Sequence, residues 1–329
     1  ITPTGAIQVA STGTYQHAMN AGTVPTATWV SGSTCLITGV TLNQPGGLAQ
    51  AFHHVTWNST GQSTTVNMTI TSSVNWGGNF TIISTGTTPQ QLRLTNSTIT
   101  LGIGGNLDIQ GGIFVSQNAA LTSTLNITGN MLVSGSGSYS GITTSGGFTT
   151  INLGGNLDVA NTATFTNLTS NTSTAVTFNF TGVGKYMTVA SGMPTQGFSF
   201  AMATVGASLT VNSPVIVGTS RTFNITAGTV ILGTNRISGN GSFSISGTNS
   251  YLSQGDPDGL VVAIASPLGA IRTLAARTYA ANANYIYTGS TQVLGTPIAA
   301  PPFVCNSLGI NAPGGVVTLT QNVNATTNL

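Results

Sequence analysis

Apolar and polar residues alternate along most of the chain, in short runs that glycines separate. Residues 65–70, 149–153 and 176–180, for example, carry an aliphatic or aromatic residue at every second position, with Thr or Asn between them. A period of two is typical of β-strands that bury one face. The best helix candidate, residues 262–276, contains a proline and a glycine and has no capping residues. The pattern therefore predicts an all-β chain with helix below about 10%.

A short phrase recurs between residues 74 and 159. In each copy an Asn follows Gly and opens a new alternating run, at Asn79, Asn106, Asn130 and Asn156. The spacings are 27, 24 and 26 residues, and a repeat of a few tens of residues indicates a solenoid. A meander of hairpins would also give short strands, but it does not require a fixed phrase at this spacing. We therefore expect a right-handed parallel β-helix (β-solenoid) with about 25 residues per coil.

The repeats suggest one elongated domain over residues 1–329, with about a dozen coils. Residues 1–72 would form less regular N-terminal coils, residues 73–215 carry the clear repeats, and residues 216–329 would form the C-terminal coils. The first residues lack the charged and apolar segments of a signal peptide. The last residues stop within a strand pattern and without the capping repeat that a solenoid needs. We therefore expect the chain to be a fragment of a longer protein.

Two roles remain open for the repeated Asn. Its side-chain amide could bond the equivalent residue of the next coil, which would form a ladder along the solenoid. Alternatively, each Asn could simply adopt the left-handed turn conformation that Asn tolerates beside Gly. Neither role is catalytic.

Charge is scarce: charged residues make up 3% of the chain, which has six Lys and Arg, four acidic residues and no Glu. These charges are scattered in the sequence, so we expect no basic patch and no nucleic-acid partner. No apolar run reaches the roughly 18 residues of a membrane helix, so we expect a chain that does not span a membrane. The surface must consist of Thr, Ser, Asn and Gly, which suits extracellular β-sheet proteins.

The only two cysteines, Cys35 and Cys305, lie 270 positions apart in the sequence. That separation corresponds to about ten coils, or about 50 Å at ~4.8 Å per strand spacing. A disulfide requires the two Cα atoms to lie within about 7 Å. We therefore expect two unpaired, buried thiols.

Three groups of residues could carry chemistry. Asp256 and Asp258 could contribute to a calcium loop, but calcium needs about six to eight oxygen ligands, and Asp-Pro and Asp-Gly are common turn dipeptides. The turn is therefore the favoured interpretation. His53 and His54 suggest a metal site, but neighbouring strand residues point to opposite faces. A role in packing or at the surface is therefore favoured.

Asp108 and Asp158 occupy matching positions two repeats apart. Glycoside hydrolysis needs two carboxyl groups on one face, and two coils would separate these acids by about 10 Å. However, the matching positions of neighbouring copies hold Thr81 and Leu132, and neither acid has a cation nearby in the sequence. We therefore expect no catalytic, cofactor-binding or metal-binding residue.

Two parts of the chain resemble a known group of proteins, and the resemblance is carried by residues 13–18, 24–29, 32–39, 45–58, 283–290 and 304–320. The chain looks similar to the large β-strand-repeat cell-surface proteins of Bacteroidota that the type 9 secretion system exports. In these relatives a Cys often follows the Trp-Asn pair, and Ser59 stands at that position here.

This resemblance implies a secreted structural or adhesive protein at the cell surface, with the type 9 secretion machinery as its partner during export. Surface glycans or other surface proteins are further candidate partners. The alternatives are a glycan-binding module on one face of the β-helix and, third, a β-helix polysaccharide lyase or hydrolase. A row of exposed aromatic residues would favour glycan binding, and Asp clustered with Arg or Lys on one face would favour an enzyme. A smooth Thr, Asn and Ser surface would favour a stalk.

Overall fold

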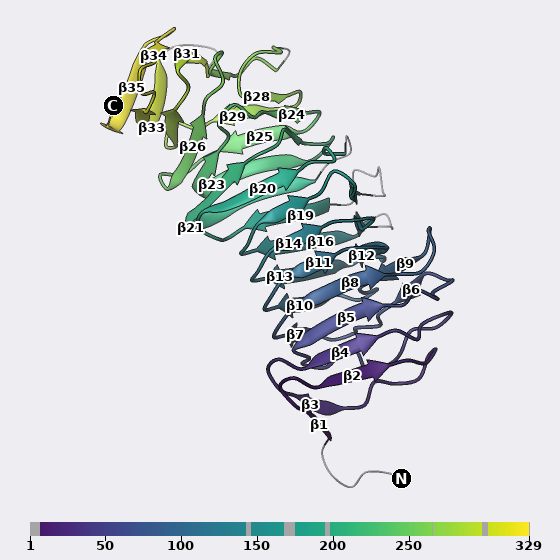
Figure 1. Ribbon diagram of the computed structural model, residues 1–329. Coiled ribbons are helices and arrows are strands. Elements are labelled where there is room, and N and C mark those ends of the chain that lie inside the picture. The colour runs from purple at the N-terminus through teal and green to yellow at the C-terminus, as the bar shows by residue number, and fades with distance from the viewer. Residues whose placement is uncertain are drawn as a thin grey trace. The chain divides into compact units, whose positions relative to one another are not determined.

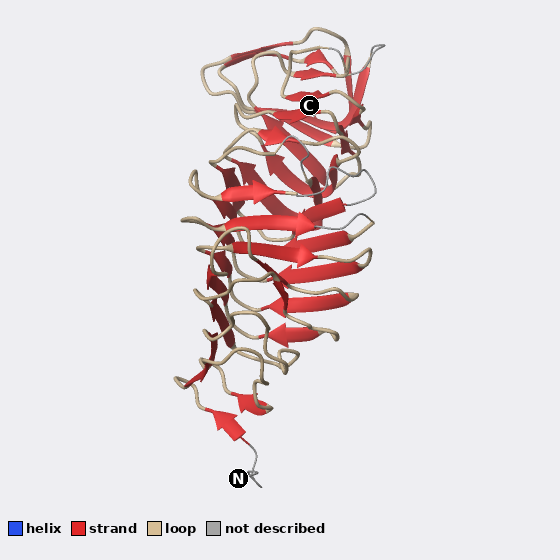
Figure 2. Ribbon diagram, turned by 90° about the vertical axis from the view of Figure 1, so that its right-hand side faces the viewer, coloured by secondary structure: helices blue, strands red, loops and turns tan. Residues whose placement is uncertain are grey.

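The computed structural model describes residues 7–142, 146–167, 175–194, 198–264, 266–297 and 302–328. All regular secondary structure in these ranges is β-strand (Figure 2). Within them the strands stack in parallel as a β-solenoid of about 13 turns, about 24 residues apart. The fold predicted from the alternation and the repeat is therefore confirmed. No helix suited to crossing a membrane occurs in the described part of the chain.

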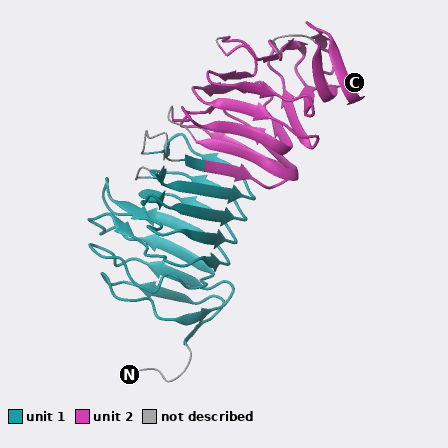
Figure 3. Cartoon of the chain, turned by 180° about the vertical axis from the view of Figure 1, so that it is seen from behind, with its two compact units in different colours: residues 1–176 teal, residues 177–329 magenta. Residues whose placement is uncertain are grey.

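Residues 1–176 and 177–329 form two compact units (Figure 3). In the first unit most coils contribute three short strands, so that β10, β11 and β12 form one coil and β13, β14 and β15 the next (Figure 1). The strands of this unit are β1 (Ile7–Val9), β2 (Thr14–His17), β3 (Ala27–Trp29), β4 (Thr34–Ile37), β5 (His54–Asn58), β6 (Val66–Asn67), β7 (Val74–Trp76), β8 (Phe80–Ser84), β9 (Gln91–Arg93), β10 (Ile99–Ile103), β11 (Leu107–Ile109), β12 (Ile113–Gln117), β13 (Thr122–Ile127), β14 (Met131–Val133), β15 (Ser138–Ile142), β16 (Phe148–Leu153), β17 (Leu157–Val159) and β18 (Thr164–Thr166).

The second unit repeats the principle with longer strands, such as β21 and β23, whose pairing contains register shifts. The strand β19 (Ala175–Phe180) contains the boundary between the units. The others are β20 (Lys185–Val189), β21 (Ser199–Val211), β22 (Val215–Ile216), β23 (Thr222–Ile231), β24 (Ile237–Gly239), β25 (Ser242–Ile245), β26 (Ser250–Gln254), β27 (Leu260–Val261), β28 (Ile271–Thr273), β29 (Arg277–Tyr279), β30 (Asn284–Tyr287), β31 (Thr291–Val293), β32 (Gly295–Thr296), β33 (Phe303–Ile310), β34 (Val316–Thr318) and β35 (Val323–Asn328).

The register places like residues over like residues. Leu101 of β10 pairs with Leu125 of β13, which pairs with Ile151 of β16, and all three side chains are fully buried. Each apolar side chain therefore packs on its equivalent about 4.8 Å away in the next coil. This stacking explains why a period-two pattern with a coil-length repeat folds into a solenoid: each coil offers the next one the surface that it needs.

The repeated Asn residues form a ladder of hydrogen bonds. The backbone N–H of Asn106 donates to Oδ1 of Asn79 (2.9 Å), that of Asn130 to Oδ1 of Asn106 (2.8 Å), and that of Asn156 to Oδ1 of Asn130 (2.8 Å). None of the four has a positive φ. The ladder interpretation is therefore confirmed and the left-handed one is wrong, because the side-chain oxygen bonds the next coil instead of its own turn.

The ladder also explains why Gly precedes each Asn. A Cβ added at Gly155 would lie 2.6 Å from Oδ1 of Asn130 in the preceding coil, and a Cβ at Gly129 would lie within 3.0 Å of Oδ1 of Asn106. Neither glycine has a positive φ. These positions therefore require Gly for space rather than for backbone conformation.

Aromatic side chains form a continuous stack in the interior of each unit. Neighbouring ring centroids are 4.6 to 6.3 Å apart in the first unit and 5.1 to 6.3 Å apart in the second. Aromatic pairs at such distances contribute about 0.5–1.5 kcal/mol each beyond their burial. The stacks consist of Tyr15, Trp29, Phe52, Trp76, Phe80, Phe114, Tyr139 and Phe165 in the first unit, and of Phe178, Phe200, Phe223, Phe243, Tyr279, Tyr285 and Phe303 in the second.

Both cysteines lie in strands with their side chains in the core. Cys35 of β4 and Cys305 of β33 are fully buried, and both are free thiols. Burial raises the pKa of Cys35 to about 12 and also raises the pKa of Cys305. The predicted burial of both thiols is confirmed.

Candidate functional site

The Asp256–Asp258 segment forms the expected turn, which Gly259 closes by donating its backbone N–H to the carbonyl of Asp256 (3.0 Å). Charged side chains that are scattered in the sequence come together here. Asp256 is fully buried, and its Oδ2 accepts a hydrogen bond from Nε of Arg236 (2.7 Å) and lies 3.8 Å from a terminal nitrogen of Arg272. The coils bring these side chains together although 20 and 16 positions separate the arginines from Asp256 in the sequence.

This charged cluster has the geometry of a structural ion pair. Oδ1 of Asp256 accepts the backbone N–H of Asp258 (3.0 Å), and the backbone carbonyl of Asp256 accepts a bond from Gln292 (2.9 Å). The two guanidinium groups compensate the charge of the buried carboxylate, which would otherwise be costly. They also occupy its surroundings with positive charge, which disfavours calcium. The cluster ties together the loops that precede β24 and follow β26.

The prediction that His53 and His54 point to opposite faces is wrong. Their rings lie 4.3 Å apart at 82° to each other, because β5 begins at His54 and strand alternation does not extend to His53. Nδ1 of His54 accepts the backbone N–H of Asn79 (3.0 Å), and Nε2 of His53 bonds the hydroxyl of Ser31 (3.1 Å). No group of three or more potential metal ligands occurs within the described ranges.

His54 occupies the first position of the Asn ladder. The register of β5 on β8 aligns Val55 with Phe80. His54, which precedes Val55, therefore matches Asn79, which precedes Phe80. Nδ1 of His54 accepts the same kind of backbone bond that Oδ1 of Asn79 accepts from Asn106. Burial, and secondarily the neighbouring His53 ring, lowers the pKa of His54, which favours the neutral ring that can accept this bond.

Asp108 and Asp158 lie on one face, as their matching positions predict. Leu132 lies between them, paired with Asp108 on one side and with Asp158 on the other. Oδ2 of Asp108 accepts a hydrogen bond from the side chain of Gln110 (2.6 Å). The two acids, Leu132 and neighbouring residues line a shallow depression with a volume of about 310 Å³. The expected arrangement of Asp108, Leu132 and Asp158, and of Thr81 opposite Asp108, is confirmed.

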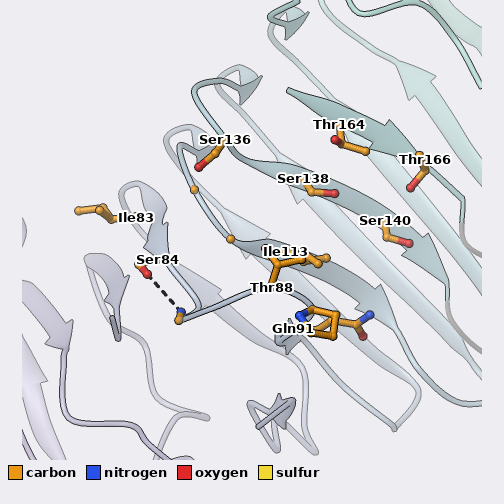
Figure 4. A pocket seen from close by; sticks show the side chains of 14 residues that line it. Ile83, Ser84, Thr88, Gln91, Ile113, Ser136, Ser138, Ser140, Thr164 and Thr166 are labelled. Carbon is orange, nitrogen blue, oxygen red and sulfur yellow. Dashed lines mark hydrogen bonds between the residues drawn. The ribbon is translucent and has the colours of Figure 1, made fainter. Parts of the chain in front are cut away.

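A larger groove lies over the outer face of β9, β12, β15 and β18, four strands of one five-stranded sheet (Figure 4). Its volume is about 510 Å³. The residues that line it are uncharged, and most of their polar side chains carry a hydroxyl group. The lining consists of Ile83, Ser84, Gly86, Thr88, Pro89, Gln91, Gly111, Gly112, Ile113, Ser136, Ser138, Ser140, Thr164 and Thr166.

Strand alternation builds the floor of this groove. Tyr139 of β15 points into the aromatic stack, so the residues on either side of it, Ser138 and Ser140, face outward. The register then places Ser138 beside Thr164 of β18, and Ser140 beside Thr166. Four hydroxyl groups therefore form a two-by-two array, with about 4.8 Å between the strands.

Ser140 differs from the other three. It is fully buried although it belongs to the outer face, and its Oγ has no hydrogen-bond partner. A buried hydroxyl without a partner costs about 1–3 kcal/mol. The groove therefore contains one polar group whose hydrogen-bonding capacity is unused.

Sequence reasoning did not find the groove, although a signal for its floor exists. Ser138-Tyr139-Ser140 and Thr164-Phe165-Thr166 share the pattern hydroxyl, aromatic, hydroxyl at matching positions of consecutive coils. One wall consists of Ile83 near the end of β8 and of Thr88 and Pro89 in the loop after β8, and no periodicity predicts the path of that loop.

Comparison of the chain with protein-family models, curated proteins and solved structures finds no match. The resemblance to the Bacteroidota surface proteins therefore stays a prediction.

Proposed function

We propose that this chain is part of a secreted structural or adhesive repeat protein at the cell surface, exported by the type 9 secretion system. The observation that supports this role best is the way the coils are joined. Apart from the cluster around Asp256, the contacts between coils described above are made by uncharged elements, namely stacked apolar side chains, aromatic stacks and the Asn ladder. Such contacts are insensitive to salt and need no cofactor, which suits a protein that works outside the cell through an extended surface.

The outer faces agree with this role. Outward positions on the strands of the first unit are mostly Thr, Ser and Asn, as in Thr124 and Asn126 of β13 and Thr150 and Asn152 of β16. Neutral side chains of this kind adhere through many weak contacts rather than through one strong site. Among the described residues with large exposed apolar side chains, Phe148 is the one aromatic. These residues therefore form no row of exposed aromatic side chains of the kind that would favour glycan binding.

The test is the location of the full-length protein in its native cells. We expect antibodies raised against this chain to label intact cells, and externally added protease to remove the label. A strain without a functional type 9 secretion system should retain the protein inside. Cytoplasmic retention in the secretion-competent strain would contradict the proposal. Unchanged surface labelling in the secretion-deficient strain would contradict the export route alone.

A glycan-binding module remains the second candidate, and the hydroxyl-lined groove is the observation that favours it. The third candidate, a polysaccharide lyase or hydrolase, depends on Asp108 and Asp158. Asp256 is unsuited to that role because its carboxylate is already bonded to Arg236. If the purified chain cleaved a polysaccharide and the double variant Asp108→Asn/Asp158→Asn did not, the enzyme interpretation would replace the structural one.

A further inference from the structure

We propose that the groove over β12, β15 and β18 is a binding site for a short stretch of neutral polysaccharide, with the hydroxyl of Ser140 as a direct hydrogen-bonding group. This proposal rests on the adhesive function proposed above and specifies the ligand class for one of its surfaces. It begins from the unpartnered Oγ of Ser140, which is fully buried and belongs to the groove lining.

The composition of the lining selects a neutral ligand. None of the 14 lining residues is charged. The nearest cation along the strands, Arg93 of β9, is not part of the lining, and its Nε donates to the side chain of Gln91 (2.9 Å). An anionic ligand would enter the groove without a counter-charge among these residues, and a cationic ligand would meet no carboxylate. A charged group would lose its hydration without compensation.

The polar groups of the groove match a polyhydroxylated ligand. Ser138, Ser140, Thr164 and Thr166 each offer one donor and acceptor sites, and a Ser or Thr hydroxyl can rotate to suit its partner. Sugar hydroxyls likewise donate and accept, so the same array can satisfy several of them at once. A ligand hydroxyl at Ser140 would also remove the cost of its unpartnered Oγ.

The apolar parts of the groove match the other face of a sugar ring. Ile83 is 40% exposed, and it lines the groove together with Pro89 and Ile113 (Figure 4). A pyranose ring carries C–H groups that can cover such aliphatic side chains while its hydroxyls bond the array. The volume of about 510 Å³ lies within the range of about 300–1,000 Å³ that is typical of small-molecule sites.

The site is shaped before any ligand binds, which limits the entropy cost of association. Ser138 and Ser140 lie on β15, Thr164 and Thr166 lie on β18, and the paired strands hold all four at fixed positions. The loop that forms the opposite wall is held at Gly86, whose backbone N–H donates to the hydroxyl of Ser84 (3.1 Å). With few hydrogen bonds and no aromatic platform, we expect a dissociation constant on the order of 0.1–1 mM.

The experiment measures binding of soluble oligosaccharides to the purified 329-residue chain by ligand-observed NMR and calorimetry. The neutral probes are short α-linked and β-linked oligomers of glucose and short oligomers of xylose and of N-acetylglucosamine. The acidic probe is an oligomer of galacturonic acid. The variant Ser138→Leu places an aliphatic side chain in the groove, and Ser140→Ala removes the unpartnered hydroxyl. The matched controls are Thr122→Leu and Thr122→Ala, because Thr122 lies on β13 of the same coil, is exposed and does not line the groove.

We expect at least one neutral probe to bind saturably. Ser138→Leu should abolish this binding, Ser140→Ala should weaken it about two- to tenfold, and both Thr122 variants should bind as the parent does. All variants should melt close to the parent, and if Ser138→Leu does not fold, Thr164→Val at the exposed rim replaces it. Saturable binding of the acidic probe alone, no binding at all, or equal loss in the Thr122 variants would overturn the proposal. Surface labelling of cells is independent of these results, so failure of the groove and failure of the adhesive function are distinguishable.

Discussion

Replacing Gly129 by Ala tests whether the Asn ladder dictates the Gly-Asn phrase. The new Cβ would lie 2.6 Å from the carbonyl oxygen of Gly105 and within 3.0 Å of Oδ1 of Asn106. Gly105 O belongs to the backbone of the preceding coil and cannot swing away, so either the coils must separate locally or the turn must shift. Overpacking of this kind costs about 1–3 kcal/mol.

The substitution also affects the ladder itself. In the parent, the backbone N–H of Asn130 donates to Oδ1 of Asn106 (2.8 Å). If the side chain of Asn106 rotates away from the new methyl group, this N–H loses its acceptor. An unsatisfied backbone donor costs about 1–3 kcal/mol. We therefore expect Gly129→Ala to lower the free energy of unfolding of the first unit by about 2–5 kcal/mol in total.

Urea unfolding followed by tryptophan fluorescence measures this loss, because the protein's three tryptophans, Trp29, Trp57 and Trp76, are buried in the first unit. The matched control is Gly61→Ala. At that exposed position the nearest atom to an added Cβ is a methyl carbon of Thr41 at 3.5 Å, so stability should change by less than about 0.5 kcal/mol. If both variants unfolded with the same midpoint as the parent, the steric explanation of the phrase would be wrong.

Three further predictions follow from buried groups. Cys35 and Cys305 should react with an alkylating reagent slowly in the native state and rapidly in denaturant, because burial both shields the thiols and raises their pKa. Mass spectrometry measures the extent of labelling, and fast labelling in the native state would contradict this prediction. Because the pKa of His54 is lower in the folded than in the unfolded chain, the unfolded chain takes up a proton on this ring first as the pH falls. The contribution of the neutral His54 ring to stability is therefore complete above pH 6.5 and is lost as the pH falls through the folded-state pKa. The variant His54→Asn should keep the ladder bond and show a smaller loss of stability on acidification, measured by urea midpoints at several pH values. Asp256→Asn should lower the unfolding free energy of the second unit by about 2 kcal/mol, since it leaves two guanidinium groups beside a buried neutral amide. Asp258 is 38% exposed, so Asp258→Asn should change that free energy by less than about 0.5 kcal/mol. Circular dichroism during unfolding distinguishes these outcomes.

The sequence by itself determined the strand character, the coil length and the position of the ladder. These features are local or repeat from coil to coil: alternation sets which face of a strand is buried, and the spacing of Asn79, Asn106, Asn130 and Asn156 equals the length of chain in one turn. Since each coil packs mainly on its neighbours, a repeat in sequence becomes a repeat in space.

Only the tertiary structure decided which unlike residues meet. His54 accepts a ladder bond although no Gly-Asn phrase marks its coil, because the register of β5 on β8 places its Nδ1 where an Asn oxygen lies in later coils. Asp256 meets Arg236 and Arg272 because the loop after β26 lies beside the start of β24 and its paired strand β28. Ser140 faces outward by alternation and is nevertheless buried. The common reason is that strand pairing fixes the rungs of the solenoid, whereas the turns between them vary in length and fold over its faces, where no periodic signal records their contacts.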